Sequence, residues 1–481
     1  MDLLFHINDI PLVNLNRMGK RLIGLDYGRG LAIMGLIFCH SIMGGIAGWD
    51  TSILFDLASK VPIVLVIIIL VPVVFMGMMG SLFSFITAIC VTISSIKIHS
   101  KGFKYLIQYC IMKIVFAFLL KGIEDFWSDT LTDFDMFKRG RIEFPVAYIH
   151  YWAHTLDDVG FFSWTVPLCV AAVTSIPKIH YYGHMAILCA LGIVLLYFNE
   201  YVLALFETMA KFCQEKEVYL FYYLFMKVAD GAFAIGQYFP FALFGGAYGI
   251  LFSKTRDFKT YWIFTGILSV FLLAGFFRFV FVEKDIVTRS LGWIKPTCFL
   301  YLMGIVQAVA MIFVMHFTDN PKRNIQKRYR AVKRTTFLRR INCLSLTAYI
   351  AEGAYCKTMY VIFKVFFGNG ADREQGTMIW PWYIVLLYMV VCVWVWCLLV
   401  KLWEKAEFRF CAEQQLSVIM SWLFKQPYNK MDYKNAIYGP INELQQEIER
   451  MNKETTTVVE IASSPSTEPT VNTDIPPSET N

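Results

Sequence analysis

The sequence predicts an all-α protein, a polytopic integral membrane helix bundle of about ten transmembrane helices. Of its 481 residues, 57% are hydrophobic and only 17% are charged, whereas soluble domains carry about 25% charged residues. The mean hydropathy is +0.51. No large polar stretch precedes residue 427, which excludes a soluble domain held by a single membrane anchor.

Ten apolar segments are long enough to cross a bilayer, for which a helix needs about 20 residues. They lie at 24–47, 61–96, 105–123, 156–177, 183–205, 233–253, 260–282, 296–317, 342–366 and 379–403. The second segment is too long for one straight helix. We expect it to tilt, to extend beyond the membrane, or to break near Val71-Pro72 or Gly77–Gly80.

The loop charges predict the orientation of these segments, because cytosolic loops carry an excess of lysine and arginine. Loop 318–341 holds nine basic residues against Asp319, whereas loop 123–158 holds eight acidic residues against three basic ones. Ten spans with both termini cytosolic place every basic loop on the inner side. The charge of loop 318–341 also fits contact with anionic lipid; binding the phosphates of a nucleotide-like donor is the alternative. The longest outer loops, 123–155 and 206–232, are candidates to cover an extracytoplasmic opening.

Four regions are predicted along the chain: a cytosolic N-terminal segment (1–20), the membrane domain (21–425), a cytosolic polar segment (426–454) and a Ser/Thr/Pro-rich tail (455–481). The composition of the tail predicts disorder. The first 18 residues lack an apolar core, so we expect the first span to act as its own insertion signal. The 12 cysteines form no C-x-x-C pair and are expected to be small buried hydrophobes rather than disulfides or metal ligands.

The first span carries an unusual polar pattern. At about 100° per residue, Arg29 lies about 60° and His40 about 40° from Asp26, so these three residues share one helix face. Along the axis, Asp26 and His40 are roughly 21 Å apart. Ionisable groups inside a span cost about 2.5–3.5 kcal/mol each on insertion scales. The opposite face gathers three small residues that allow close helix approach, namely Gly24, Gly28 and Gly35.

The polar face of the first span can be interpreted either as a structural feature or as a functional site. Asp26 and Arg29 are three residues apart and can form an ion pair that fixes the helix end. His40 can be a hydrogen-bonded structural residue. It can also be a general base or nucleophile, because imidazole titrates near neutral pH.

A second polar face is predicted in segment 342–366, where Ser345, Tyr349 and Glu352 fall within about 60° of one another. Glu352 lies about 15 Å into the span, so it must pair, protonate or face water. A lined cavity and a structural hydrogen bond are the alternatives. Elsewhere in the sequence, His150, His154 and Asp158 recur every four residues. This spacing suits an interfacial polar face better than a metal site, because no further ligand accompanies them.

The stretch from Arg21 to His40, R-L-I-G-L-D-Y-G-R-G-L-A-I-M-G-L-I-F-C-H, resembles the N-terminal motif of the transmembrane acyltransferases related to heparan-α-glucosaminide N-acetyltransferase and their bacterial membrane relatives. Four later segments resemble that family in the same order: Phe239–Gly245, Lys295–Gly304, Leu344–Tyr349 and Trp403–Leu416. The resemblance covers about residues 20–425. The chain departs from the family pattern at Gly24, where Ser is usual, at Gln414-Gln415, and at Glu352, where relatives often carry His or Gln.

The resemblance implies transfer of an acyl group, with acetyl expected, from cytosolic acyl-CoA to a hydroxyl or amine acceptor at the extracytoplasmic side, with a sugar or glycan as the expected acceptor. It implies a catalytic set of His40, Asp26 and Glu352. The donor-binding set it implies consists of Arg29, Arg21, Lys20 and Tyr349. In this scheme His40 deprotonates the acceptor or accepts the acyl group transiently, and Asp26 orients Arg29.

The expected partners are the lipid bilayer, acyl-CoA as donor substrate, and a carbohydrate or other small acceptor. No metal and no nucleic acid is expected. The oligomeric state is open, with a homodimer as one option, and so are the organelle and the acyl length. The rival interpretation is a proton-coupled transporter or channel that uses Asp26, His40 and Glu352 as proton or substrate sites. A non-catalytic relative of the acyltransferases is the third alternative.

Overall fold

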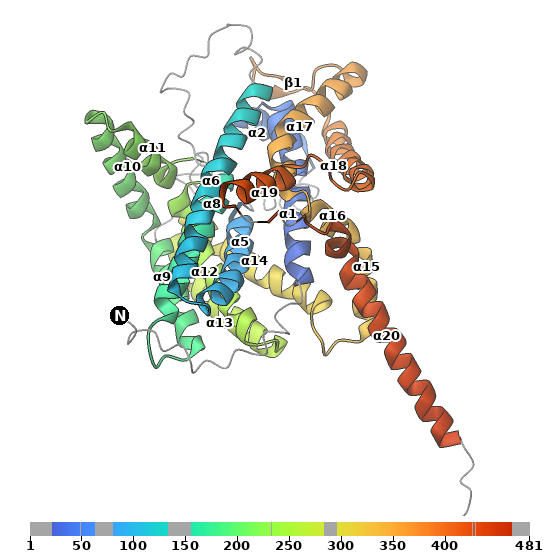
Figure 1. Ribbon diagram of the computed structural model, residues 1–481. Helices are drawn as coiled ribbons and strands as arrows, with labels where there is room; N and C mark the ends of the chain where they lie inside the picture. Colours follow the sequence, from blue (N-terminus) through green and yellow to red (C-terminus); the bar gives the residue numbers. More distant parts are fainter. Residues whose placement is uncertain are drawn as a thin grey trace, which may run out of the picture.

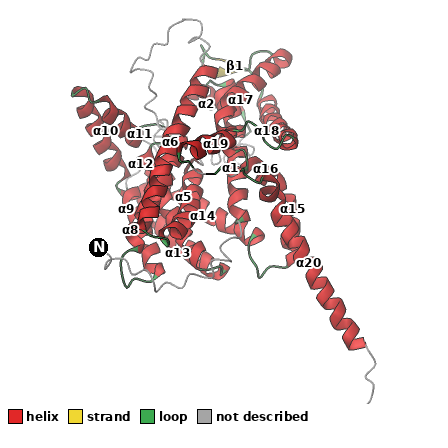
Figure 2. Cartoon of the chain, in the orientation of Figure 1, coloured by secondary structure: helices red, strands yellow, loops and turns green. Residues whose placement is uncertain are grey.

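The computed structural model describes residues 22–48, 50–62, 80–132, 155–231, 233–282, 296–425, 427–428 and 430–463, without the side chains of residues 51, 80, 123–132 and 454–463. Helices make up about four-fifths of this part of the chain (Figures 1 and 2). The strands described there form one short antiparallel hairpin, β1 (Ala371–Asp372) with β2 (Thr377–Met378). The described chain is therefore an all-α helical bundle, as the composition predicts.

Eight of the described helices are long and apolar enough to cross a membrane. They are α1 (Ile23–His40) continued by the π-helical segment η2 (Ser41–Ile46), α5 (Gly80–His99), α6 (Phe103–Thr132), α8 (Thr155–Thr174), α12 (Ile235–Lys254), α13 (Phe258–Phe281), α14 (Thr297–Thr318) and α18 (Trp382–Lys405). This number of apolar helices indicates a multi-pass membrane protein. Residues 63–79, which include Val71-Pro72 and most of Gly77–Gly80, lie outside the described chain, and so does the predicted break in segment 61–96.

Two more predicted spans are helical but differ from the other eight. Helix α17 (Ser345–Phe367) is long enough, but it carries Glu352, Lys357 and Lys364 within an otherwise apolar sequence. Helix α9 (Tyr181–Tyr197) ends early, and the chain turns by 70° into α10 (Asn199–Glu215). The predicted segment 183–205 is therefore a pair of helices with a bend between them rather than one straight helix. The predicted outer loop 206–232 is also largely helical, because it contains the end of α10 and all of α11 (Tyr219–Ala229).

Helix α12 forms the centre of the bundle and packs against α5, α8 and α9. It is buried along almost its whole length, as expected for a helix that is apolar on every side. Two glycines allow it to approach α5 closely. A Cβ atom at Gly245 would lie 2.3 Å from the carbonyl oxygen of Phe85, and one at Gly249 would lie 2.5 Å from Cβ of Thr92. Small residues four apart thus permit the backbone contact on which this core is built.

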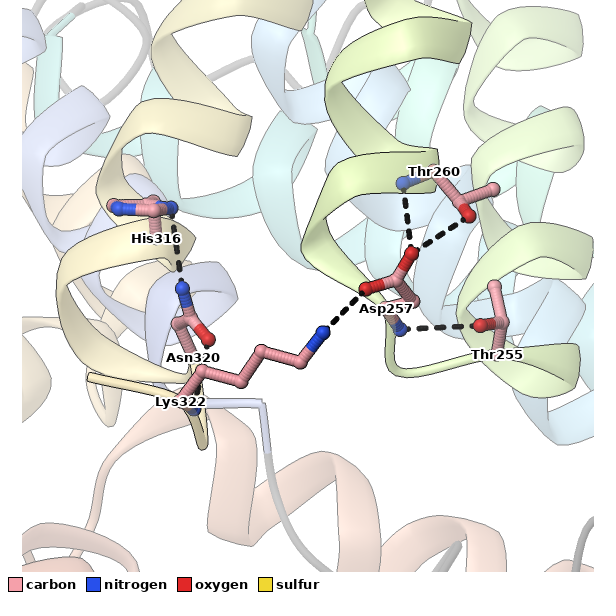
Figure 3. Close-up of polar contacts among 6 residues, drawn as sticks. All are labelled: Thr255, Asp257, Thr260, His316, Asn320 and Lys322. Atoms are coloured by element: carbon pink, nitrogen blue, oxygen red, sulfur yellow. Dashed lines mark hydrogen bonds and ion pairs between the residues drawn. The ribbon is translucent and has the colours of Figure 1, made fainter.

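The loops before α13 and after α14 lie together at one end of the bundle (Figure 3). Asp257 caps α13 by accepting from the backbone N–H of Thr260 at 3.3 Å, and it also accepts from Nζ of Lys322 at 3.3 Å. These hydrogen bonds, the one from Lys322 foremost, hold the pKa of Asp257 below its usual range. Nearby, Asn320 bonds Nδ1 of His316 at 3.3 Å. We call this end of the bundle the basic side, because α14 ends here and the loop 318–341, with its lysines and arginines, begins here.

Five further helices complete the described chain beyond the spans: α2 (Thr51–Lys60), α15 (Ile325–Arg334), α16 (Thr336–Asn342), α19 (Ala412–Leu423) and α20 (Tyr433–Ser463). Helix α20 packs on α15 and then extends away from the bundle (Figure 1). Arg339 of α16 is fully buried and donates to the backbone carbonyls of Val332, at 2.9 Å, and Ile437, at 3.1 Å. Helix α20 runs past the predicted start of the tail at residue 455, and residues 464–481 lie outside the described chain.

The glycine contact between α12 and α5 predicts a strong effect of adding a side chain there. We expect Gly245→Val to lower the stability of the detergent-solubilised protein by about 1–3 kcal/mol or more, since overpacking a core against backbone leaves no flexible neighbour to move. The matched control is Gly266→Ala on α13, where an added Cβ meets no atom within 4 Å. Thermal unfolding followed by size-exclusion chromatography measures both variants. Equal melting temperatures for the two would contradict the close packing.

Candidate functional site

His40 and Glu352, two residues singled out separately in the sequence, meet in the structure. Nδ1 of His40 lies 2.7 Å from Oε1 of Glu352, and the two side chains are only 13% and 10% exposed. His40 is the last residue of α1, directly before η2. Short π-helical segments inside longer helices occur frequently at functional sites. The structure thus joins the polar faces of α1 and α17 at one buried acid–base pair.

The opposite face of α1 packs as its glycines predict. A Cβ atom at Gly24 would lie 2.4 Å from Cγ of Met315, and one at Gly28 would lie 2.8 Å from Cε of Met311. Both methionines belong to α14. Because the small face of α1 is pressed against α14, its polar face is left to meet α17, which carries Glu352.

Two carboxylates from other parts of the chain hold the N-terminal ends of the paired helices. Asp319 accepts from the backbone N–H groups of Ile23 at 2.9 Å and Gly24 at 2.8 Å, at the start of α1. Glu413 of α19 accepts from those of Leu346 at 2.7 Å and Thr347 at 3.2 Å, at the start of α17. A carboxylate at a helix N-terminus satisfies free backbone donors and complements the helix dipole. Burial raises the pKa of both carboxyl groups.

Sequence reasoning missed both of these capping residues. It counted Asp319 only as the lone acid of a basic loop, although a signal was present at each helix start. The residues at the two N-cap positions are Leu22 and Leu344, and neither provides a side-chain cap. A helix that begins after a leucine needs an acceptor from elsewhere. The contact of Glu413 with α17 also brings two of the family-like segments, Leu344–Tyr349 and Trp403–Leu416, side by side.

Asp26 is buried, and its described hydrogen bond comes from Nδ2 of Asn342 at 3.0 Å. The ion pair with Arg29 that the spacing suggests is not formed among the described residues. The physical reason is the approach of α16 to α1. A Cβ atom at Gly30 would lie 2.2 Å from the backbone oxygen of Leu338, so α16 is close enough to place Asn342 against the carboxylate.

Arg29 has no hydrogen bond or ion pair within the part of the chain that the structure describes, although it is half-buried. Lys113 of α6 lies close enough to Arg29 for the two charges to interact. Its ammonium group lies 5.5 Å from the ring centre of Tyr109 and 5.3 Å from that of Phe116, within the range of cation–π contacts. Two cations thus lie near each other, and no described carboxylate pairs with either of them.

Packing contacts place Lys113 at about the same height as Arg29 along the axes of the bundled helices. Ile86 of α5 lies against Gly28, and Phe83, one turn away, makes an edge-to-face contact with Tyr349 at 6.3 Å between ring centres. Tyr349 packs in turn in the same cluster as Phe116, which is one turn from Lys113. The signal that sequence reasoning passed over was a lysine about ten residues into an apolar span.

Tyr349 lies one turn from Glu352, between α5 and α6, and so belongs to the same face as the His40–Glu352 pair. The other two predicted donor-binding residues, Lys20 and Arg21, lie outside the described residues, as do His150 and His154. Asp158 is fully buried and accepts from the hydroxyl of Ser84 at 3.4 Å.

The described residues form neither a cluster of possible metal ligands nor a disulfide bond. No group of three or more His, Cys, Asp and Glu residues suited to a metal ion occurs among the described residues. All twelve cysteines are free, and eight of them are buried, which agrees with their predicted role as small hydrophobes.

The paired His40 and Glu352 have the chemical capacity of an acid–base dyad. When Nδ1 of the imidazole carries the proton, the carboxylate accepts it in a hydrogen bond and leaves Nε2 as a basic nitrogen. A carboxylate in this position orients the ring and stabilises the imidazolium that forms when Nε2 takes a proton. The second carboxylate oxygen, Oε2, is buried and has no hydrogen-bond partner among the described residues.

Comparison with known proteins found no match: neither a family model, nor a curated protein, nor a solved structure is significantly similar to this chain. The resemblance to the transmembrane acyltransferases therefore stays a prediction from the residues quoted above. The geometry around His40 is the independent basis for a functional argument.

The capping role of Asp319 is testable by substitution. We expect Asp319→Ala to lower stability by about 0.5–2 kcal/mol, the usual loss for a helix cap, because the first two N–H groups of α1 lose their acceptor. Asp319→Asn keeps an acceptor oxygen and should lose less. Thermal unfolding of the purified proteins measures their stabilities, which should fall in the order parent, Asn variant, Ala variant. If both the Asn and the Ala variant were as stable as the parent protein, the Asp319 cap would make no contribution to stability.

Proposed function

We propose that this protein is an integral membrane acyltransferase. It moves an acyl group, with acetyl expected, from cytosolic acyl-CoA to a hydroxyl or amine acceptor, expected to be a sugar or glycan, on the extracytoplasmic side. The observation that carries the proposal is the buried His40–Glu352 pair, with 2.7 Å between Nδ1 and Oε1. The family-like segments of the sequence support the same assignment.

The proposed topology has ten spans, which adds α9 and α17 to the eight helices that pass as spans by length and apolarity. Both termini are then cytosolic. The basic side of the bundle faces the cytosol, because lysine and arginine accumulate in cytosolic loops. With this orientation, α1 and α17 start near the cytosolic side and carry His40 and Glu352 toward the extracytoplasmic side.

The donor is proposed to enter from the basic side. Arg29 and Lys113 are cations without a described acidic partner, and they suit the phosphate groups of a CoA molecule. Lys20 and Arg21, at the entrance of the same helix, are proposed to assist them. Arg29 lies roughly 16 Å from His40 along α1. The pantetheine arm of the donor extends along this face, with Tyr349 beside its path.

The reaction follows from the acid–base pair. Nε2 of His40 accepts the proton of the acceptor's hydroxyl or amine while its oxygen or nitrogen attacks the thioester carbonyl. The carbon–sulfur bond then breaks, the imidazolium returns the proton to the departing CoA thiolate, and the acylated acceptor and free CoA result. Glu352 holds Nδ1–H throughout and stabilises the imidazolium. Asp26 acts as a positioning residue through Asn342 and α16.

Removal of the base provides the test. We expect His40→Ala to lower acyl transfer from labelled acetyl-CoA about 10²–10⁴-fold, the usual contribution of general acid–base catalysis. Glu352→Gln should lower it less, because an amide oxygen still accepts from Nδ1. The control is His184→Ala, since His184 lies on α9 and contacts the carbonyl of Ile176. Full transfer by His40→Ala would overturn the assigned mechanism.

The cation pair makes a separate prediction about donor affinity. We expect Lys113→Gln to raise the KM for acetyl-CoA about 10-fold with little change in kcat, because a charge-assisted bond to phosphate is worth about 1.5–3 kcal/mol. Lys104→Gln is the control, since Lys104 is exposed near the start of the same helix. Steady-state kinetics of both variants decide the point. An unchanged KM for Lys113→Gln would remove this residue from the donor path.

A transporter remains the second candidate, because a buried histidine–carboxylate pair inside a span also suits a proton relay. The unpartnered Oε2 of Glu352 is the observation that favours it. Reconstituted liposomes distinguish the two functions. A transporter gives flux driven by a pH gradient and binds no CoA, whereas the acyltransferase binds CoA and shows no such flux.

A further inference from the structure

Helices α10 and α11 form an arm, residues 199–229, that stands apart from the bundle. The arm starts where the chain bends by 70° after α9. The two helices pack against each other, with a turn at Glu217, whose φ is +58°. Figure 1 shows them projecting together from the body of the protein.

The outer surface of α10 is divided into an apolar and a polar stripe. Tyr201, Leu205 and Phe212 are 75%, 58% and 60% exposed, and at about 100° per residue they fall within about 40° of one another. Glu207 and Lys211 form an ion pair of 2.7 Å, about 100–140° around the helix from that stripe. Such separation of exposed faces is typical of helices that lie in a membrane interface.

The exposed apolar surface of α9 leads directly into the apolar stripe of α10. Leu191, Val194 and Phe198 are exposed on the span side of the bend, and Tyr201 and Leu205 follow beyond it. The lipid-facing surface of a span is thus continuous with the surface of the arm. Helix α11 adds further exposed apolar side chains, Tyr219, Leu220, Phe221 and Leu224.

The bend carries a residue pair that is typical of a membrane interface. At the end of α9, the guanidinium of Arg278 lies 4.9 Å from the ring centre of Tyr197. Tyrosine and arginine at span ends mark the interface between hydrocarbon and headgroups. A helix that turns by 70° from a span along the membrane normal runs about 20° from the membrane plane. Over its length of roughly 25 Å, its depth then changes by about 8 Å, close to the thickness of that interface.

The free end of the arm is charged and its base is anchored. Glu215, Lys216 and Glu217 lie at the turn between α10 and α11, where they can reach water. At the base, Nζ of Lys227 lies 2.8 Å from Oδ2 of Asp157, and both side chains are almost fully buried. The buried ion pair ties the end of α11 to α8 and fixes the direction from which the arm leaves the bundle.

We propose that the arm lies in the lipid interface of the leaflet at which α9 ends, with Tyr201, Leu205 and Phe212 among the acyl chains and Glu207 and Lys211 toward water. The occupant of the exposed apolar surface is the bilayer itself, because that surface continues the lipid-facing surface of α9. The arm thereby extends the membrane contact of the protein on one side of the bundle.

Photo-crosslinking of the full-length protein in lipid nanodiscs tests this placement. A benzoylphenylalanine in place of Leu205 should form lipid adducts, detected by mass spectrometry of the purified protein. The same group in place of Glu207 should form at least about five times fewer. Equal adduct yields at the two positions would overturn the proposal. A crosslinked dimer from position 205 would also overturn it, by showing a second copy of the chain on this surface.

Hydrogen exchange keeps the proposal testable if the crosslinker disturbs folding. In nanodiscs, Leu205→Glu with Phe212→Glu should raise amide exchange across α10, because two charges no longer allow the stripe to enter the interface. Glu207→Gln with Lys211→Gln, on the polar stripe, should leave exchange unchanged. The proposal fails if both double variants exchange like the parent.

Discussion

The hydrogen bond between His40 and Glu352 is the interaction on which the arrangement of the membrane domain depends. It joins two helices whose starts are fixed by carboxylates from distant parts of the chain, Asp319 for α1 and Glu413 for α17. Ionisable groups inside a span are costly unless they pair, so each of these two residues requires the other. The glycines that press α1 against α14 turn its polar face toward α17, and the pair therefore forms only because the packing on the other face is close.

Much of this arrangement was predictable from the sequence. The all-α class follows from composition, and the shared face of Asp26, Arg29 and His40 follows from helical spacing, as does the opposite glycine face. The partner of His40 was not predictable, because Glu352 is 312 residues away and periodicity carries no information on which helices meet. Asp319 and Glu413 were missed for the same reason. Segment 183–205 was predicted as one span because hydropathy does not register the bend at Phe198.

Within the bundle, the site and the rigid core are separate. Helix α12 and its neighbours form a tightly packed body in which backbone approaches backbone, whereas Arg29 lies on α1 near α6 and the His40–Glu352 pair joins α1 to α17. Arg29, with Lys113 near it, lies roughly 16 Å along α1 from His40, and this is the distance that the proposed donor has to span.

The central proposal is that a cytosolic donor lies along α1, with its phosphate end at Arg29 and its reactive end at His40. The most direct measurement is a structure of the protein in nanodiscs with a non-hydrolysable acetyl-CoA analogue. The account predicts phosphate groups in contact with Arg29 and Lys113, and the carbonyl of the analogue within hydrogen-bonding reach of the His40–Glu352 pair. An analogue bound elsewhere, or no bound analogue at saturating concentration, would contradict it.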